Sequence, residues 1–294
     1  MIRNYWRRAI PPPDAGRRTP PLLAQRGRPI IVGHPPDFER PDSQLPSAAQ
    51  ILSARFEQWR AAFRWAGGLN RKLWEYLYIL NAIDCYVGMG EGVRALGFGT
   101  GKERIPALLA ARGCTVLATD YQEPEGDGQG WETRSLADLF HPELCHEKVF
   151  SERVSFRPVD MNAIPPDLTE YDCLWSCGSL EHIGGLRNGM DFVLRAMDCL
   201  RPGGIAVHTT EFNLCSNDLT FESPELAFYR RRDIEELAAT LIAQGHQIVL
   251  NFTRGDSPAD LHVDRAPFTY ELSITALVCG HVITSLGLII QKGG

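Results

Sequence analysis

The sequence predicts an α/β protein built on a mainly parallel sheet. From Glu91 onward, short apolar runs of strand length alternate with segments of helical pattern. Such alternation implies right-handed βαβ crossovers, which bring the carboxyl ends of the strands to one edge, where ligands bind. The chain has 294 residues, of which 44% are hydrophobic and 22% charged, so it can bury the core of one large domain.

The chain divides into three predicted parts. Residues 1–46 are rich in proline and arginine and predict a flexible arm, the alternative being an arm that docks on a partner or an anionic surface. Ser47 is a plausible N-cap for a helix over 48–66, and a second helix is predicted over 69–87 after Gly67-Gly68. These helices form a predicted helical cap, residues 47–90, before an α/β domain over 91–294.

Within the α/β domain the elements follow one another regularly. The predicted strands are 93–96, 115–120, 154–160, 171–177, 205–210, 246–250 and 285–292. The predicted helices between them are 102–112, 187–200 and 233–244, the second ended by the breaker "RPGG".

Composition argues against several classes of protein. No apolar run is long enough to span a membrane, and the first thirty residues lack the apolar stretch of a secretory signal. The eight cysteines are scattered without a CxxC pair, which favours reduced thiols in a cytoplasmic protein. A net charge of −6 argues against a protein whose surface coats nucleic acid.

The stretch "GFGTGKE", residues 97–103, follows the first predicted strand of the domain. A P-loop aligned on Gly101-Lys102 would have Leu96 for its first glycine and Glu103 for its hydroxyl residue. A dinucleotide fingerprint would need glycine where Lys102 stands. The loop therefore predicts a close backbone approach to a ligand other than a pyrophosphate.

Acids end the next two predicted strands. Asp120 comes nineteen residues after Gly101, where a carboxylate can accept both hydroxyls of a ribose. Asp160 ends the third strand, where its carboxylate or the adjacent backbone could meet an adenine amino group, and Met161 offers the ring an apolar face.

In order and spacing, these motifs, with "YDCLWSCGSLEHI" (171–183) and "LRPGGIAVHT" (200–209), resemble those of class I S-adenosylmethionine-dependent methyltransferases. The resemblance implies a Rossmann-like seven-stranded sheet whose last strand is antiparallel, with S-adenosyl-L-methionine lying over the first strands. It also implies a set of cofactor contacts: Gly97, Gly99, Gly101, Glu103, Asp120, Tyr121, Asp160, Met161 and Cys177.

One position departs from the family. Many members carry an acid two residues before the first glycine that helps to hold the methionine ammonium, whereas this chain has Ala95. We expect Glu103, the backbone, or Arg71 and Glu75 of the preceding helix to take over that role.

The catalytic candidates are His182, Glu211 and His262, each of which follows a predicted strand and is expected at the same rim. His182 is the preferred base, because imidazole titrates near neutral pH; the alternative is a structural histidine bonded to the next loop. Some related O-methyltransferases use "EH" at this position to bind a metal. A bound Mg²⁺ or Mn²⁺ is therefore the second alternative, although Gly178 stands where those relatives usually have a further glutamate. The candidate metal ligands are Glu181, His182, Glu211, His262 and Asp264.

The segment "SCGS" after the fourth strand does not match the Asn-Pro-Pro-aromatic loop typical of amine methylation in this superfamily, which favours an oxygen acceptor. The sequence thus predicts a cytoplasmic O-methyltransferase acting on a small molecule or glycan, with a homo-oligomer left open. RNA 2′-O-methylation is the alternative within the enzyme class, motivated by "EH", "EFN" and the arginine-rich arm. A catalytically silent S-adenosylmethionine-binding subunit is the alternative outside it.

Overall fold

The computed structural model describes residues 30–122, 133, 135–268 and 272–294. The helices are α1 (Ala48–Ile51), α2 (Ala54–Phe63), α3 (Arg71–Tyr86), α4 (Ile105–Ala111), α5 (Glu147–Arg153), α6 (Leu186–Ala196), α7 (Arg231–Ala243) and α8 (Pro258–Leu261). The strands are β1 (Ile30–Val32), β2 (Ser43–Gln44), β3 (Arg94–Phe98), β4 (Thr115–Asp120), β5 (Val154–Pro158), β6 (Tyr171–Cys177), β7 (Leu200–Asn213), β8 (Gln247–Asn251), β9 (Val263–Asp264), β10 (Thr275–Val278) and β11 (His281–Gln291).

The central sheet has the strand order β8-β11-β7-β6-β3-β4-β5. Strands β7, β6, β3, β4 and β5 pair in parallel, and β11 runs antiparallel to both β7 and β8. The predicted fold class, a mainly parallel sheet with an antiparallel last strand, is confirmed. The predicted strands 115–120 and 171–177 coincide with β4 and β6, whereas β7 and β11 are longer than predicted because they pair with each other from Ile205 to Asn213.

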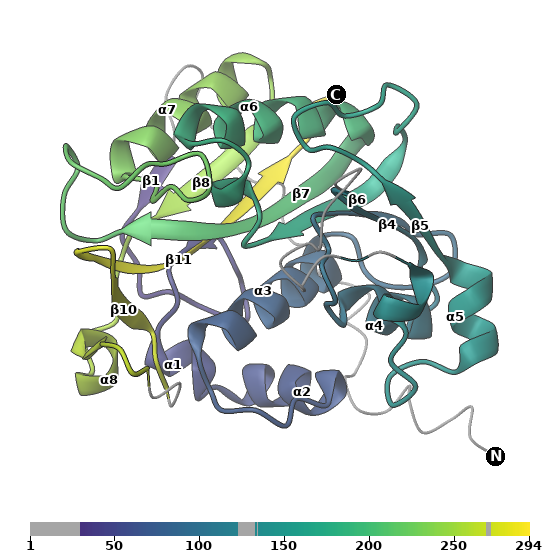
Figure 1. Cartoon of the computed structure of the whole chain (residues 1–294), viewed down its shortest axis with the longest axis horizontal. Coiled ribbons are helices and arrows are strands. Elements are labelled where there is room, and N and C mark those ends of the chain that lie inside the picture. The colour runs from purple at the N-terminus through teal and green to yellow at the C-terminus, as the bar shows by residue number, and fades with distance from the viewer. Residues whose placement is uncertain (1–29, 123–132, 134, 269–271) are drawn as a thin grey trace.

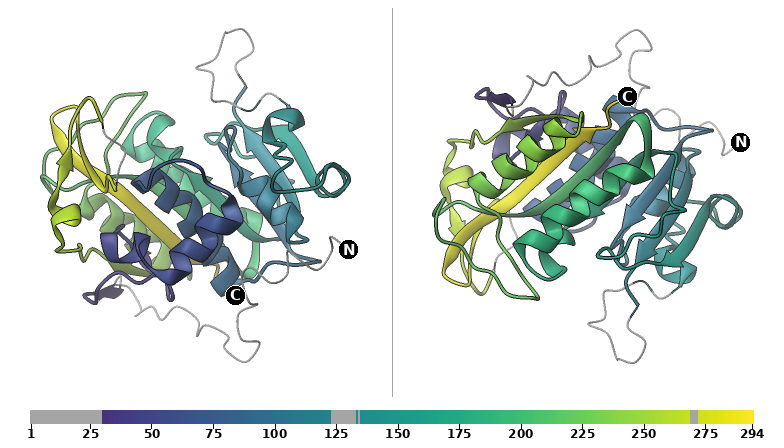
Figure 2. Two further views of the ribbon diagram at one scale, coloured as in Figure 1. Left: turned by 90° about the horizontal axis from the view of Figure 1, so that it is seen from below. Right: turned by 90° about the horizontal axis from the view of Figure 1, so that it is seen from above.

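Helices cover both faces of the sheet (Figures 1 and 2). Helices α6 and α7 pack on one face, and α3, α4 and α5 pack on the other, each over its own buried apolar cluster. Helix α3 reaches across β6, β7 and β11. A β-carbon at Gly287 of β11 would overlap the ring of Tyr78, so this glycine allows α3 to approach the sheet closely. The apolar surface of α3 is therefore buried against the sheet and the α2 helix.

The fold begins earlier than predicted. Strands β1 and β2 pair in parallel with β8. Phe38, which lies between the two strands in sequence, and Leu45, which follows β2, are each 1% exposed. The hydroxyl of Tyr78 donates to the Asp42 carbonyl at 2.5 Å. Residues 30–46 thus belong to the folded body, because the edge of β8 offers unpaired backbone groups to short extended segments, which proline permits at an edge. The rest of the predicted arm, residues 1–29, lies outside the described residues.

The predicted helix over 48–66 is two helices. Ser47 caps α1 as predicted: its hydroxyl accepts from the Gln50 amide at 3.3 Å, and the Gln50 side chain accepts from the Ser47 amide at 2.9 Å. Ser53 then accepts from the Phe56 amide at 3.2 Å and starts α2. A second serine cap therefore divides the segment, since its hydroxyl competes with helical hydrogen bonding.

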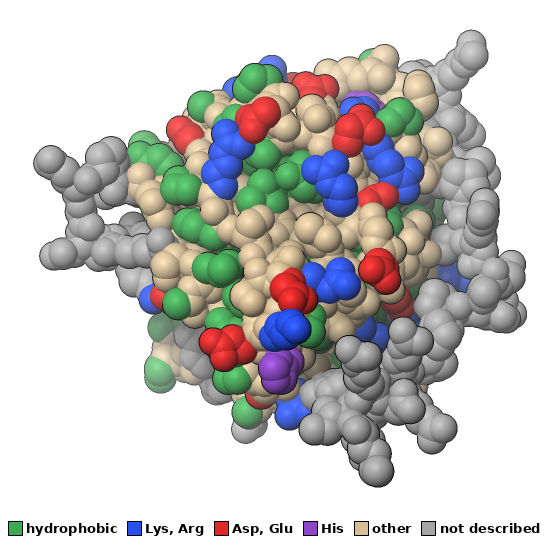
Figure 3. All heavy atoms as spheres, turned by 90° about the vertical axis from the view of Figure 1, so that its right-hand side faces the viewer, with side chains coloured by type: hydrophobic (Ala, Val, Ile, Leu, Met, Phe, Trp, Pro, Cys, Tyr) green, Lys and Arg blue, Asp and Glu red, His purple; other side chains and the backbone are tan. Residues whose placement is uncertain are grey.

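Figure 3 shows the face at the right of Figure 1, where acidic and basic side chains of the described residues alternate. In the part of the chain that the structure describes, every helix is too short or too polar to cross a membrane.

Candidate active site

The glycine loop joins β3 to α4 at the carboxyl edge of the sheet. Gly99 and Gly101 have φ angles of +56° and +49°, a backbone region that favours glycine. A β-carbon at Gly99 would lie 2.7 Å from Ser179 Oγ and 3.3 Å from Met161 Sδ, and one at Gly97 would overlap Trp175. The loop is therefore packed closely against β6 and the turn that follows it, and the close approach of its backbone to a ligand stays a prediction.

Asp120, at the end of β4, lies against this loop. Its carboxylate accepts hydrogen bonds from the backbone N–H groups of Gly101 at 3.1 Å, Tyr121 at 2.9 Å and Thr133 at 2.8 Å. Asp120 is 8% exposed, and its backbone partners orient the carboxylate next to the glycine loop. The structure thus brings Asp120 next to the glycine loop, and both belong to the predicted cofactor site.

The remaining predicted contacts differ in accessibility. Met161 is 5% exposed beside Gly99, whereas Tyr121 is 49% exposed. Asp160 is exposed, and its side chain accepts from the Asn162 backbone at 2.7 Å. Cys177 is buried, with its thiol 3.5 Å from Lys72 Nζ.

Glu103 is a buried carboxyl group beside the glycine loop. It is 6% exposed, and the indole N–H of Trp175 donates to its Oε1 at 2.5 Å. Burial raises the pKa of Glu103 to about 8, against the opposing effects of the Trp175 hydrogen bond and the Lys72 charge. In the free protein Glu103 is therefore mostly protonated at neutral pH.

A charged cluster lies between α3 and the ends of β6 and β7, with the buried Glu75 at its centre and the partly exposed Arg71 and Lys72 beside it. Glu75 Oε1 accepts from the Ser285 hydroxyl at 2.6 Å. Glu75 Oε2 lies 3.1 Å from both Lys72 Nζ and the Thr209 hydroxyl. Although burial raises the pKa of Glu75, the Lys72 and Arg71 charges outweigh it and hold that pKa below its usual value. Glu75 is therefore ionised, and both of its carboxylate oxygens have hydrogen-bond donors within the protein.

Glu181 and Glu211, which we call the acidic pair, adjoin this cluster. Glu181 is 2% exposed and accepts from the Thr210 hydroxyl at 2.9 Å. Glu211 Oε1 accepts from Arg71 Nη1 at 2.7 Å, whereas its Oε2 is buried without a hydrogen-bond partner. Burial and the neighbouring Glu211 raise the pKa of Glu181 to about 8, and burial also raises the pKa of Glu211 in spite of Arg71. Both carboxyl groups of the acidic pair therefore bind a proton more readily than an exposed glutamate does.

Gly178 is the point on which the charged groups converge. Its φ is +58°, and a β-carbon there would lie 2.7 Å from Lys72 Nζ, 3.3 Å from Glu75 Oε2 and 3.4 Å from Glu181 Oε1. The glycine thus gives the charged groups direct access to the backbone at the end of β6.

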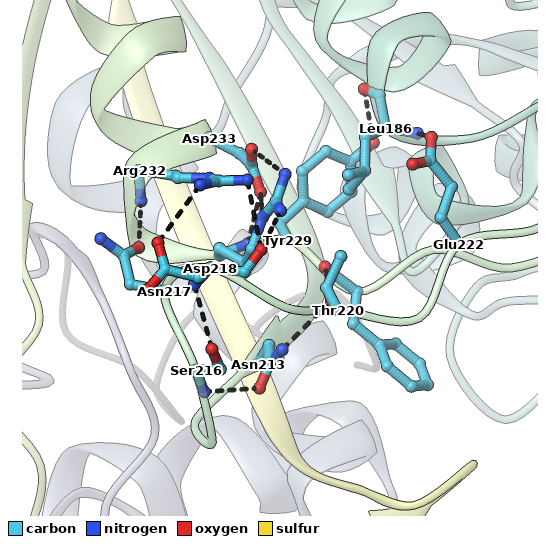
Figure 4. Close-up of polar contacts among 12 residues, drawn as sticks. Leu186, Asn213, Ser216, Asn217, Asp218, Thr220, Glu222, Tyr229, Arg232 and Asp233 are labelled. Carbon is cyan, nitrogen blue, oxygen red and sulfur yellow. Dashed lines mark hydrogen bonds and ion pairs between the residues drawn. The ribbon is translucent and has the colours of Figure 1, made fainter.

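Figure 4 shows polar contacts of the segment between β7 and α7. Asn217 Oδ1 accepts from the Arg232 amide at 2.7 Å, and Glu222 accepts from the Leu186 amide at 2.9 Å. The amide of Tyr229 donates to the Glu211 carbonyl at 2.9 Å, which fixes the backbone of β7 beside the acidic pair. The segment is therefore tied at both ends to the elements that carry the site.

His182 and His262 lie outside the cluster. His182 is exposed, and its Nδ1 is 2.6 Å from the Glu225 carbonyl, which is the contact expected of the structural alternative. His262 is exposed beside β9, and β10 and β11 separate β9 from β7, which makes three strand spacings, or roughly 14 Å. The structure therefore does not bring His262 to Glu211, because the predicted rim did not allow for the inserted strands β9 and β10.

The candidate metal ligands are likewise divided. Glu181 and Glu211 are neighbours, but His182 points to Glu225, and His262 and Asp264 belong to the β9 region. Among the described residues, no three His, Cys, Asp or Glu side chains are grouped in a way that could hold a metal ion. The predicted alternative of an Mg²⁺ or Mn²⁺ site therefore has no support in the described geometry.

Several members of the site could not be recognised from the sequence. Lys72, Thr209 and Ser285 contact Glu75, but each resembles an ordinary helix-surface or strand residue. One signal was present: Arg71, Lys72 and Glu75 are three charged residues within the first five positions of a largely apolar helix, at the spacing that places side chains near one another.

Comparisons with known proteins agree with this architecture. No family model matches the sequence, and no curated protein matches it. Among solved structures, the [4+2]-cyclase SpnF is 16% identical, with 92% of this chain and 99% of that chain covered at a TM-score of 0.50. The CcbJ methyltransferase from Streptomyces caelestis is 13% identical, with 76% of this chain and 94% of that chain covered at a TM-score of 0.42. The 1,6-didemethyltoxoflavin-N1-methyltransferase from Burkholderia thailandensis, with bound S-adenosylhomocysteine, is 18% identical, with 69% of this chain and 72% of that chain covered at a TM-score of 0.41.

The strand order, together with the likeness to SpnF, shows the fold: this chain has a Rossmann-like methyltransferase fold.

Proposed function

We propose that the protein is an S-adenosylmethionine-dependent methyltransferase whose acceptor is a hydroxyl group of a small molecule or glycan. The observation that carries the proposal is the meeting of Gly99, Asp120 and Met161 at one edge of the sheet, beside a charged cluster. Ligands of such sheets lie at that edge. A cytoplasmic location and self-association belong to the proposal as well.

The residues present fit the cofactor. Asp120, whose oxygens face the amides of Gly101 and Thr133, would accept the ribose hydroxyls, and Met161 beside Gly99 would offer an apolar surface for adenine. Glu103 receives a hydrogen bond from the neutral Trp175 indole, and no ion pair to it is found among the described residues. It is therefore suited to the methionine ammonium, in the role that Ala95 cannot perform. When bound, the cofactor would supply an electrophilic methyl group on a sulfonium.

The acidic pair suits a hydroxyl acceptor. Methyl transfer to a hydroxyl requires loss of the hydroxyl proton, and a carboxylate whose pKa approaches the working pH accepts it efficiently. Glu181 lies just past the end of β6, and burial and Glu211 raise its pKa to about 8, so its ionised form is a strong base whose share grows as the pH rises toward 8. We therefore propose Glu181, supported by Glu211, as the base. The roles of His182 and His262 stay predictions, and turnover of His182→Ala and His262→Ala tests them.

The acidic pair also disfavours the RNA alternative. A phosphodiester close to Glu181 and Glu211 would meet like charge in a poorly solvated place. The other alternative, a silent subunit, would not need an uncompensated carboxyl beside the cofactor, because that arrangement is destabilising unless it serves a ligand.

Calorimetric titration of the purified protein with S-adenosylmethionine, S-adenosylhomocysteine, NAD and ATP tests the cofactor. We expect the first two to bind and Asp120→Ala to weaken their binding by about 1–3 kcal/mol, since ribose hydroxyls lose a charged acceptor. Asp167→Ala, which removes an exposed carboxylate paired with Arg157, is the matched control. Tighter binding of NAD, or equal affinity in Asp120→Ala, would refute the assignment.

A further inference from the structure

Glu181 lies on a short turn that needs support from other elements. The turn Leu180–His182 has three residues, and the amide of His182 donates back to the Ser179 carbonyl at 3.1 Å. A single helical turn is unstable in isolation. The position of Glu181 therefore depends on contacts from elsewhere in the chain.

The segment 214–230, between β7 and α7, supplies such contacts on both sides of the turn. The amide of Ala227 donates to the Glu181 carbonyl at 3.0 Å. Glu222 Oε1 accepts from the Leu186 amide at 2.9 Å and so caps α6, the helix that follows the turn (Figure 4). The segment thus fixes the backbone of Glu181 and the start of the next helix.

Tyr229 joins the backbone beside the two members of the acidic pair. Its amide donates to the Glu211 carbonyl at 2.9 Å, and its carbonyl accepts from the Asn213 amide at 2.8 Å. Its hydroxyl donates to the carbonyl of Leu180, the residue before Glu181, at 3.3 Å. The backbone of Tyr229 therefore pairs with the strand of Glu211, while its side chain holds the turn of Glu181.

The hydroxyl of Tyr229 is confined to one place. Tyr229 is 1% exposed, and the Leu186 carbonyl of α6 lies 3.4 Å from the hydroxyl as a second acceptor. A β-carbon at Gly189 of α6 would overlap the hydroxyl and would lie 2.6 Å from the Leu180 carbonyl. Glycine is unfavourable inside a helix, and here its missing side chain leaves the space that the tyrosine hydroxyl needs.

We propose that Tyr229 is a positioning residue for methyl transfer, which holds the turn of Glu181 against the strand that carries Glu211. This rests on the proposed function, in which Glu181 is the base, and adds the residue that keeps the base in place. A base must lie within hydrogen-bond reach of the proton that it accepts, so a displaced turn would lower its efficiency. Tyr229 itself takes no part in the proton transfer, because two backbone carbonyls accept from its buried hydroxyl.

The titration of Glu181 reports where the turn lies. Its Oε2 accepts from the Thr210 hydroxyl of β7 at 2.9 Å, and it is 2% exposed. If the turn loosens, Glu181 gains contact with water and moves away from Glu211, and both changes lower its pKa toward that of an exposed glutamate. The charged and titratable groups that act on Glu181 are Glu211, Glu75, Lys72, Arg71 and Tyr229.

The test is a pH titration by NMR of protein labelled with carbon-13 at the glutamate side-chain carboxyl, with Glu181→Gln to assign the signal of Glu181. Tyr229→Phe removes the hydroxyl and keeps the ring. We expect it to lower the Glu181 midpoint by about 0.5 pH unit or more. Its affinity for S-adenosylhomocysteine, measured by calorimetry, should equal that of the wild type, because Tyr229 contacts the turn and β7 rather than the glycine loop.

Tyr86→Phe is the matched control. It removes a hydroxyl that donates to the Pro41 carbonyl at 2.9 Å, away from the acidic pair, and should leave the Glu181 midpoint unchanged. An unshifted midpoint in Tyr229→Phe, or an equal shift in the control, would overturn the inference. Should Tyr229→Phe fail to fold, Gly189→Ala displaces the same hydroxyl, and a wild-type midpoint in that variant would overturn the inference as well.

The outcomes separate this inference from the proposed function. If the wild-type protein does not bind S-adenosylhomocysteine, the proposed function fails. If it binds and the midpoint of Glu181 does not depend on the Tyr229 hydroxyl, the positioning role is overturned while the methyltransferase proposal stands. A loss of S-adenosylhomocysteine binding in Tyr229→Phe would show a general disruption of the site and would also overturn the positioning role.

Discussion

Arg71 of α3 donates a 2.7 Å hydrogen bond to Glu211 of β7, across 140 residues of sequence. Arg71 also lies 3.3 Å from the Ser285 hydroxyl and 3.7 Å from Glu75 Oε1. This one guanidinium therefore joins α3 to the carboxyl edge of the sheet.

Substitution of Arg71 by methionine should be strongly destabilising. It keeps the alkyl packing but leaves Glu211 and Glu75 without their shared cation, which should lower the free energy of unfolding by about 2–3 kcal/mol. Arg60→Met, at the exposed Arg60–Glu57 pair, should cost about 0.5 kcal/mol or less. Chemical denaturation measures both, and similar losses in the two variants would contradict the role given to Arg71.

The contact made by Gly99 can be separated from its backbone strain. Gly99→Ala introduces a β-carbon near Ser179 and Met161 at a φ of +56°, whereas Gly203→Ala introduces one in open space at a φ of +77°. Each substitution introduces backbone strain that should lower stability by roughly 1 kcal/mol or more, and only Gly99→Ala should also weaken binding of S-adenosylhomocysteine, by tenfold or more. Unchanged affinity in Gly99→Ala would mean that the cofactor does not lie over this loop.

His208 should make stability depend on pH. It is 0% exposed, its Nδ1 is 2.8 Å from the Ser176 hydroxyl, and burial lowers its pKa to about 3. Below about pH 6.5 the unfolded chain binds a proton there that the folded protein does not bind until about pH 3. Its contribution to stability is thus full at pH 7 and is lost on acidification, by about 1.4 kcal/mol per pH unit.

The control variant for His208→Gln is Phe192→Leu, which retains the imidazole of His208. Denaturation between pH 7 and 4 should give a slope in His208→Gln that is smaller by one proton than in the wild type. Phe192→Leu alters the ring packed edge-on against His208 and should lower stability while retaining the slope. An unchanged slope in His208→Gln would show that the histidine is protonated in the folded protein.

Truncation tests where the fold begins. Removal of residues 1–46 deletes β1 and β2 with Phe38 and Leu45, and also removes the Phe38 carbonyl that accepts from Asn81 at 2.6 Å. We expect a loss of several kcal/mol, because two large apolar side chains leave the core. Removal of residues 1–29 keeps every described contact and should change the melting temperature little. Equal losses from the two truncations would place essential contacts in the first 29 residues.

The local elements could be predicted because short-range physics specifies them. The apolar runs at 115–120 and 171–177 are buried strands, and Ser47 caps a helix through groups three residues away. The glycine loop and Asp120 also followed from the sequence, since a βαβ unit fixes which strand end faces which loop. The antiparallel last strand came with the family resemblance, which the strand order then matched.

What the tertiary structure decided is the set of partners. Glu75, Lys72 and Arg71 have the pattern of a helix surface, yet the packing of α3 across β7 and β11 buries Glu75 and brings Arg71 to Glu211 and Ser285. Likewise, the insertion of β9 and β10 separates His262 from Glu211, and the turn at Leu180–His182 directs Glu181 inward and His182 outward. Sequence patterns report which residues prefer burial or a turn. The pKa of a carboxyl depends instead on the distance to charges that are remote in sequence, and only the folded chain sets those distances.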